Sequence, residues 1–172
     1  MKLILGTREF GSAYGEGVQI PPSNPEIIKI LNLAWESGIR TLDTADTYGT
    51  EGVEKYFGEF DRLFKSRTIK DAWYHYQPYE PPLKGIKKAS VYTREQLADL
   101  DNVVIPLNIH NTEFVGVKAP IVYIRSIFDR GKLLAQGYSV KDCLSFVKRH
   151  NPQGVIVGVN SLKELEEILS VW

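Results

Sequence analysis

A carboxylate and a phenol lie close together near the start of the chain. Asp43 ends a short apolar run, Arg40–Leu42, and Tyr48 follows it five residues later. A carboxylate can pair with or polarise a neighbouring group, and a phenol can donate a proton to a substrate oxygen. The same two side chains could instead cap a turn and pack over it. The spacing alone leaves both a proton-transfer site and an ordinary loop open.

The elements before this pair predict where it lies. Residues 25–35 carry apolar side chains at helical spacing, and Gly38 follows as a C-cap. Arg40–Leu42 has the apolar character of a short buried strand. The sequence therefore predicts that Asp43 and Tyr48 lie just past the carboxyl end of a strand.

Length and composition limit the class of protein. The chain has 172 residues, 43% of them hydrophobic, with zero formal net charge and a pI near 6.8. These values predict one globular domain over residues 1–172, and they give no sign of a nucleic-acid or membrane partner. A single cysteine, Cys143, suits a reducing compartment such as the cytoplasm. The histidines have no metal-ligand spacing, so we expect no metal site.

Strands and helices alternate along the chain, which is typical of an α/β fold with a parallel sheet. One of the expected helices runs from Thr50 to Leu63. Seven strands are predicted, at Lys2–Leu5, Arg40–Asp43, Ala72–Tyr76, Lys87–Val91, Val103–Leu107, Ile121–Ile127 and Gly154–Val157.

This order favours a TIM-type (β/α) barrel. Such barrels typically take ~250 residues, so we predict a compact barrel that lacks one strand–helix unit. The carboxyl ends of parallel strands meet at one end of a barrel, where their loops form a pocket. His75, in an aromatic run, could face that pocket or be a packed core side chain. Arg125 could be a buried carboxylate partner or a pocket cation. We expect the pocket to be lined by Asp43, Tyr48, His75 and Ser90.

The stretch around Asp43 resembles the GxxxxDTAxxYGxE signature of aldo-keto reductases. The residues at or near its fixed positions are Gly38, Asp43, Thr44, Ala45, Tyr48, Gly49 and Glu51. The similarity continues in the first loop, LGTREFG, and in later segments that resemble the fourth to eighth barrel strands of that family. The resemblance implies an NAD(P)H-dependent oxidoreductase that reduces the carbonyl group of a small molecule.

The resemblance also implies roles for individual residues. Asp43, Tyr48 and His75 correspond to three members of a catalytic tetrad that is completed by a lysine. Ser90 corresponds to the serine that holds the nicotinamide amide, and Ser126 lies in a segment like the family's RSVF. The last helix corresponds to the one that receives the adenosine phosphate, which implies cofactor contacts at Ser161, Lys163 and Glu167. Free N–H groups at that helix N-terminus would favour a phosphate in any case.

The chain departs from the family pattern at the lysine. Only five residues separate Lys70 from His75, or about 16 Å along a strand at ~3.3 Å per residue. The third strand and its helix are therefore expected to be deleted, and Lys84 and Lys70 remain the alternatives for the tetrad lysine. Glu164 stands where the family often has an arginine for the 2′-phosphate of NADP. A carboxylate there favours NAD, or no cofactor.

The incomplete tetrad leaves a second interpretation open. The barrel could be catalytically impaired or repurposed as a binding or assembly module. An open edge where a strand is missing would favour association, for example as a homo-oligomer.

Overall fold

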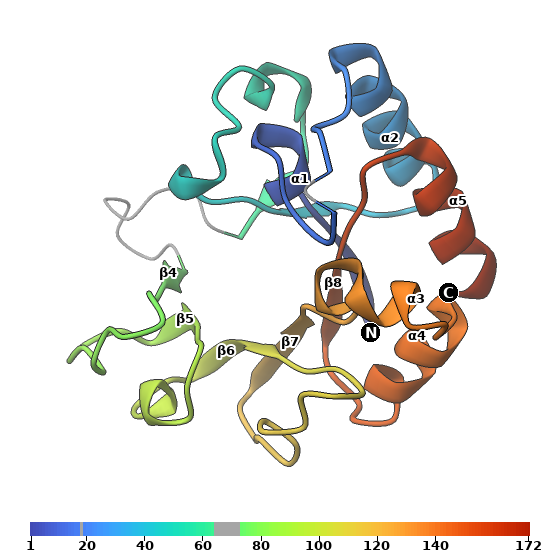
Figure 1. Ribbon diagram of the computed structural model, residues 1–172. Helices are drawn as coiled ribbons and strands as arrows, with labels where there is room; N and C mark the ends of the chain where they lie inside the picture. Colours follow the sequence, from blue (N-terminus) through green and yellow to red (C-terminus); the bar gives the residue numbers. More distant parts are fainter. Residues whose placement is uncertain (18, 64–72) are drawn as a thin grey trace.

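The computed structural model describes residues 1–17, 19–63 and 73–172, and its centre is a curled parallel sheet (Figure 1). The sheet has eight strands in the order β3-β2-β1-β8-β7-β6-β5-β4. Apart from β3 and β4, which stand at the two ends of this order, neighbours in sequence are neighbours in the sheet. Strand β8 pairs with β1, as in a (β/α) barrel. The strands are β1 Lys2–Gly6, β2 Thr41–Asp43, β3 Asp61–Arg62, β4 Tyr74–His75, β5 Lys88–Ser90, β6 Asn102–Pro106, β7 Ile121–Arg125 and β8 Gly154–Gly158.

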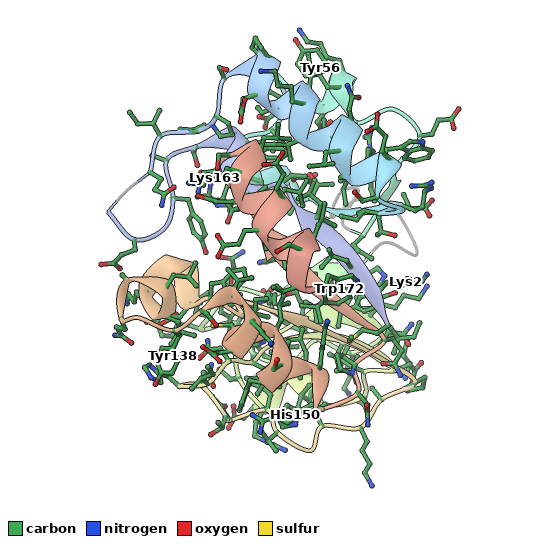
Figure 2. The ribbon with its side chains drawn as sticks, turned by 90° about the vertical axis from the view of Figure 1, so that its right-hand side faces the viewer. Lys2, Tyr56, Tyr138, His150, Lys163 and Trp172 are labelled. Atoms are coloured by element: carbon green, nitrogen blue, oxygen red, sulfur yellow. The ribbon has the colours of Figure 1, made fainter. Side chains whose placement is uncertain are left out.

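The helices gather on one part of the barrel. Figure 1 shows α2, α5 and α4 along one side of the sheet, and Figure 2 shows the same helices side by side from that side. Between β2 and β7, the helical segments of the described residues are short 3₁₀ turns. They are η1 Asp46–Tyr48, η2 Glu54–Tyr56 and η3 Glu95–Leu97. The helices are α1 Arg8–Gly11, α2 Asn24–Glu36, α3 Lys132–Ala135, α4 Val140–Lys148 and α5 Leu162–Val171.

The long helices form where the sequence supports them locally. In α2, Ile27, Ile30, Leu31 and Ala34 form one buried face, and Gly38 follows with φ +86°. A capping box between Ser139 and Asp142 begins α4. Packing of these faces on the sheet fixes the strand ends that carry the polar residues.

Side chains along each strand alternate between two apolar layers, as the strand period requires. The outward side chains of β1 and β8, such as Leu5 and Val155, pack in one cluster with the helices. The inward ones form a second cluster inside the barrel, which includes Ile4, Val104, Tyr123 and Ile156. By the same alternation, Asp43, His75, Ser90 and Arg125 point inward at the carboxyl ends of their strands.

The structure confirms the expected compact, incomplete (β/α) barrel. The seven-strand count is wrong, because a two-residue strand, β3, pairs in parallel with β2, so the third strand is present in short form. The predicted helix Thr50–Leu63 is also wrong: this stretch forms η2 and then β3. Gly58 has φ +49°, outside the right-handed helical region, which interrupts the helical pattern.

Candidate active site

A pocket of about 310 Å³ opens at the carboxyl ends of the strands. Asp43, Tyr48 and His75, the expected catalytic residues, all line it. So do Ser126 and Glu167, two of the five expected cofactor residues. The structure therefore brings together side chains from β2, β4, β7 and α5 around one cavity.

The remaining expected residues lie outside the pocket wall. Ser90 is fully buried beneath it. Ser161 and Lys163 are not among the lining residues, and Figure 2 shows Lys163 at the beginning of α5. Lys84 is exposed and does not line the pocket, and Lys70 lies outside the described residues. Lys84 therefore does not complete the set around Tyr48.

Asp43 and Tyr48 form a buried acid pair. The Tyr48 hydroxyl donates to Asp43 Oδ2 at 3.3 Å, and the two residues are 8% and 6% exposed. Burial raises the pKa of Asp43 to about 6, against the opposing charge of Arg125. Burial, and then the Asp43 charge, raise the pKa of Tyr48 well above its usual value. Tyr48 is therefore a neutral phenol at neutral pH and can act as a proton donor.

His75 lies between two phenols. Its Nε2 is 3.2 Å from the hydroxyl of Tyr92, and the two rings meet edge to face at 5.9 Å. On its other side the ring centroids of His75 and Tyr48 are 6.0 Å apart. Tyr92 also lines the pocket. The sequence analysis missed Tyr92, although its place two residues after Ser90, past the end of β5, is one where pocket residues are expected.

Arg125 is one of three arginines in this pocket wall, with Arg8 and Arg130. Its Nε donates to Ser90 Oγ at 3.1 Å and its Nη2 to the Val91 carbonyl at 2.8 Å, which ties β7 to β5. Its Nη1 donates to Ser126 Oγ at 3.1 Å. The guanidinium carbon lies 4.5 Å from the centre of the Tyr92 ring. Arg125 is thus both a buried structural partner and a pocket cation.

Glu9 adds a second acid to the pocket, which the sequence analysis did not identify. Its carboxyl packs against Gly158, where an added Cβ would lie only 2.2 Å from Glu9 Oε1. Among the described residues, Glu9 Oε2 has no hydrogen-bond partner. Burial first, opposed by its own backbone N–H and reinforced by Asp43, raises the pKa of Glu9 to about 7.

The N-terminus of α5 is occupied by the protein's own acceptors. The Leu162 N–H donates to Glu26 Oε1 at 2.8 Å, and the Asn160 N–H donates to Glu164 Oε2 at 2.7 Å. The Glu164 N–H donates to Ser161 Oγ at 3.2 Å. A phosphate here would meet two carboxylates instead of free N–H groups. Ribose hydroxyls donate to carboxylates, so these carboxylates are compatible with a ribose and unfavourable for a phosphate.

The other histidine that follows a strand lies elsewhere. His110 Nε2 is 3.3 Å from the Tyr138 hydroxyl, and neither residue lines the pocket. Among the described residues, no group of three or more His, Cys, Asp and Glu could hold a metal ion. Within the same residues, no helix has both the length and the apolar character to cross a membrane.

Comparisons with known proteins relate part of this chain to one protein family. Residues 2–71 match the model of the aldo/keto reductase family. A protein of Schizosaccharomyces pombe named "putative aryl-alcohol dehydrogenase" is 34% identical over 64 residues, which are 37% of this chain and 18% of that relative. The chain thus matches less than a fifth of this relative's length.

The fold comparison covers almost the whole chain. The crystal structure of a "putative aldo-keto reductase" from Pseudomonas aeruginosa superposes with a TM-score of 0.66. The match covers 98% of this chain and 88% of that one, at 16% sequence identity. At this identity the likeness establishes the fold.

Proposed function

We propose that this chain, whose residues 2–71 match the aldo/keto reductase family, is a reductase. Its pocket would reduce the carbonyl group of a small molecule with a nicotinamide cofactor. The observation that carries the proposal is the buried Tyr48–Asp43 pair at the pocket wall. It offers a neutral phenol where a proton is needed. NAD is the cofactor that the carboxylates at α5 favour.

The chemistry divides between the cofactor and the chain. The bound cofactor supplies a hydride to the carbonyl carbon. Tyr48 donates its hydroxyl proton to the carbonyl oxygen, and its raised pKa keeps that proton in place until the substrate arrives. With a pKa of about 6, Asp43 is partly protonated in mildly acidic solution and returns a proton to Tyr48 across their hydrogen bond. Alcohol oxidation would need an ionised Tyr48, so reduction is the favoured direction.

Activity with matched variants tests this proposal. The protein is assayed with an aromatic aldehyde and NADH at pH 6, together with Tyr48→Phe and Tyr138→Phe. Loss of a general acid typically costs about 10²–10⁴-fold in rate, so kcat should fall in the Tyr48 variant and stay unchanged in the Tyr138 variant. Equal rates in all three proteins would contradict the assignment of Tyr48.

A second candidate function is a binding barrel without turnover. The closed N-terminus of α5 favours it, as does a pocket of about 310 Å³, near the lower end of the ~300–1,000 Å³ of ligand sites. In this case the sheet edges β3 and β4 would serve association, and the protein would be a homo-oligomer. Titration of NADH fluorescence separates the two functions, since the binding barrel leaves it unchanged. Sedimentation measures the oligomeric state.

The single buried Cys143 also leads us to propose the cytoplasm as the compartment of this protein.

A further inference from the structure

We propose that Tyr92 is a second proton donor of this pocket, which acts with His75 and beside Tyr48. The inference rests on the proposed carbonyl reduction and assigns it a catalytic residue outside the expected tetrad. Three observations support it: Tyr92 lines the pocket, its hydroxyl meets His75 Nε2 at 3.2 Å, and Arg125 stacks on its ring.

The two phenols differ in the charge beside them. A phenol that gives up its proton becomes an anion, so a nearby carboxylate opposes the transfer and a nearby cation assists it. Tyr48 donates to the Asp43 carboxyl, and Asp43 raises its pKa further. Tyr92 has the Arg125 guanidinium 4.5 Å from its ring centre, closer than the 6.0 Å that separates the Arg8 guanidinium from the Tyr48 ring centre. A guanidinium over an aromatic face is attracted to its electrons, and more strongly when the ring carries negative charge.

Arg125 is held where this effect needs it. Its three hydrogen bonds go to neutral acceptors, Ser90 Oγ, the Val91 carbonyl and Ser126 Oγ. None of these three partners carries a charge, so the guanidinium acts on the Tyr92 ring as well as on the Asp43 carboxyl. The backbone of Tyr92 is also held in place, because its N–H donates to Gln96 Oε1 at 2.7 Å. The phenol and the cation are thus both positioned by the fold before a substrate binds.

The proton balance closes through His75. The Tyr92 O–H bond breaks, and a new O–H bond forms on the carbonyl oxygen as the carbonyl carbon receives the hydride of the reduced nicotinamide. A doubly protonated His75 gives its Nε2 proton to the resulting phenolate, and the neutral imidazole that is left takes a proton from solvent. One solvent proton is consumed for each alcohol formed, as carbonyl reduction requires.

The chain offers a close control for this pair. Tyr138 and His110 form the same contact, with 3.3 Å between hydroxyl and Nε2 and an edge-to-face ring distance of 5.4 Å. They lie outside the pocket wall. Removal of the Tyr138 hydroxyl therefore reproduces the loss of a His–Tyr hydrogen bond without the loss of a pocket phenol.

The experiment measures kcat and KM for an aromatic aldehyde with NADH in the wild type, Tyr48→Phe, Tyr92→Phe, the double variant and Tyr138→Phe. In the Tyr48→Phe background, we expect Tyr92→Phe to lower kcat at least about tenfold with KM nearly unchanged, since a general acid acts on the chemical step. We expect Tyr48→Phe to keep a residual rate that the double variant loses. Tyr138→Phe should match the wild type.

The outcomes that would overturn the inference differ in whether they also overturn the proposed function. If the wild type turns over, and Tyr92→Phe leaves kcat unchanged both in the wild type and in Tyr48→Phe, then Tyr92 is not a donor. The proposed function stands in that case. If the wild type shows no turnover with NADH or NADPH, the proposed function and the inference fail together. As a second variant, Arg125→Gln in the Tyr48→Phe background should lower the residual rate further, and an unchanged rate would also contradict the inference.

Discussion

The two halves of this barrel are covered by different means. Around β7, β8 and β1, the outer face of the sheet packs on helices α2, α4 and α5. Around β4, β5 and β6, loops and short 3₁₀ turns cover it among the described residues. We call these the helical half and the loop half. Both contribute to one pocket, so a barrel mouth can be built with few of the outer helices.

The loop half replaces helices with single side chains. Phe114, in the connection from β6 to β7, is 1% exposed and belongs to the same apolar cluster as the helices. Gln96 is 1% exposed, and its amide accepts from Tyr92 N–H and donates to the carbonyls of Gln77 and Glu80. One apolar anchor and one amide thus hold loops that a helix would otherwise support.

The largest expected effect tests whether the two halves unfold together. Phe114→Ala in the loop half should cost about 3–5 kcal/mol and Leu165→Ala in α5 about 2–5 kcal/mol, because both leave a cavity in one cluster. Val115, next to Phe114, is 43% exposed, and Val115→Ala should change stability by less than about 0.5 kcal/mol. Denaturant unfolding followed by fluorescence and circular dichroism measures all three. A Phe114→Ala variant as stable as Val115→Ala would show that the loop half adds little to the core.

The second prediction concerns two buried acids of the pocket, Asp43 from β2 and Glu9 from α1. Asp43 has its pKa raised from 3.8 to about 6, and Glu9 from 4.5 to about 7, by burial in both cases. The folded state holds these protons more tightly than the unfolded state. Their contribution to stability is therefore present below about pH 4 and is lost as pH rises through about 6 for Asp43 and about 7 for Glu9.

The matched variants isolate this loss. Asp43→Asn and Glu9→Gln should each be more stable than the wild type by about 3 kcal/mol at pH 8, and nearly equal to it at pH 4. Glu166→Gln, an exposed change on α5, serves as the control. Thermal unfolding across this pH range measures the differences. An Asp43→Asn protein that gains nothing at pH 8 would mean that the carboxylate is better compensated by Arg125 than its burial indicates.

The third prediction concerns the amide of the loop half. Gln96→Leu leaves the Tyr92 N–H and the Gln77 and Glu80 carbonyls without their partner. Such unsatisfied buried groups cost about 1–3 kcal/mol, and the Tyr92–His75 contact should loosen as well. Gln136→Leu, at an exposed position, should be nearly neutral. If Gln96→Leu is equally neutral, then water or another side chain supports these loops.

Local sequence patterns predicted part of this architecture. The apolar face of residues 25–35 and the C-cap Gly38 are local signals, and the structure has this helix, α2. The same signals failed between Thr50 and Leu63. There the apolar side chains are buried as expected, including Phe57 and Phe60, but from a turn and a two-residue strand. A strand of two residues is too short to show an alternation of apolar and polar side chains. It is recognised only by its pairing with β2.

The pocket shows a similar limit. Asp43 and Tyr48 are five residues apart and share a motif, so the sequence could place them together. Tyr92 meets His75 and Arg125 only because β4, β5 and β7 bring distant segments to one rim. Glu26 and Leu162, which share a hydrogen bond, are 136 residues apart. Such contacts depend on the tertiary fold, and no local spacing indicates them.

The smallest expected effect concerns the helical half, where α2 and α5 meet. Glu26 comes from the first turn of α2 and Glu164 from that of α5, and each accepts an N–H at the start of α5. A 2′-phosphate close to either carboxylate would be repelled by on the order of 1 kcal/mol, or several-fold in affinity. Glu26→Gln and Glu164→Gln keep an acceptor oxygen and remove the charge. Each should therefore tighten NADPH binding several-fold and leave NADH binding almost unchanged, while Glu166→Gln, outside the pocket wall, alters neither. Fluorescence titration of both cofactors measures these affinities. A wild type that prefers NADPH would show that the phosphate lies away from α5, and that the carboxylates at this helix serve only to join it to α2.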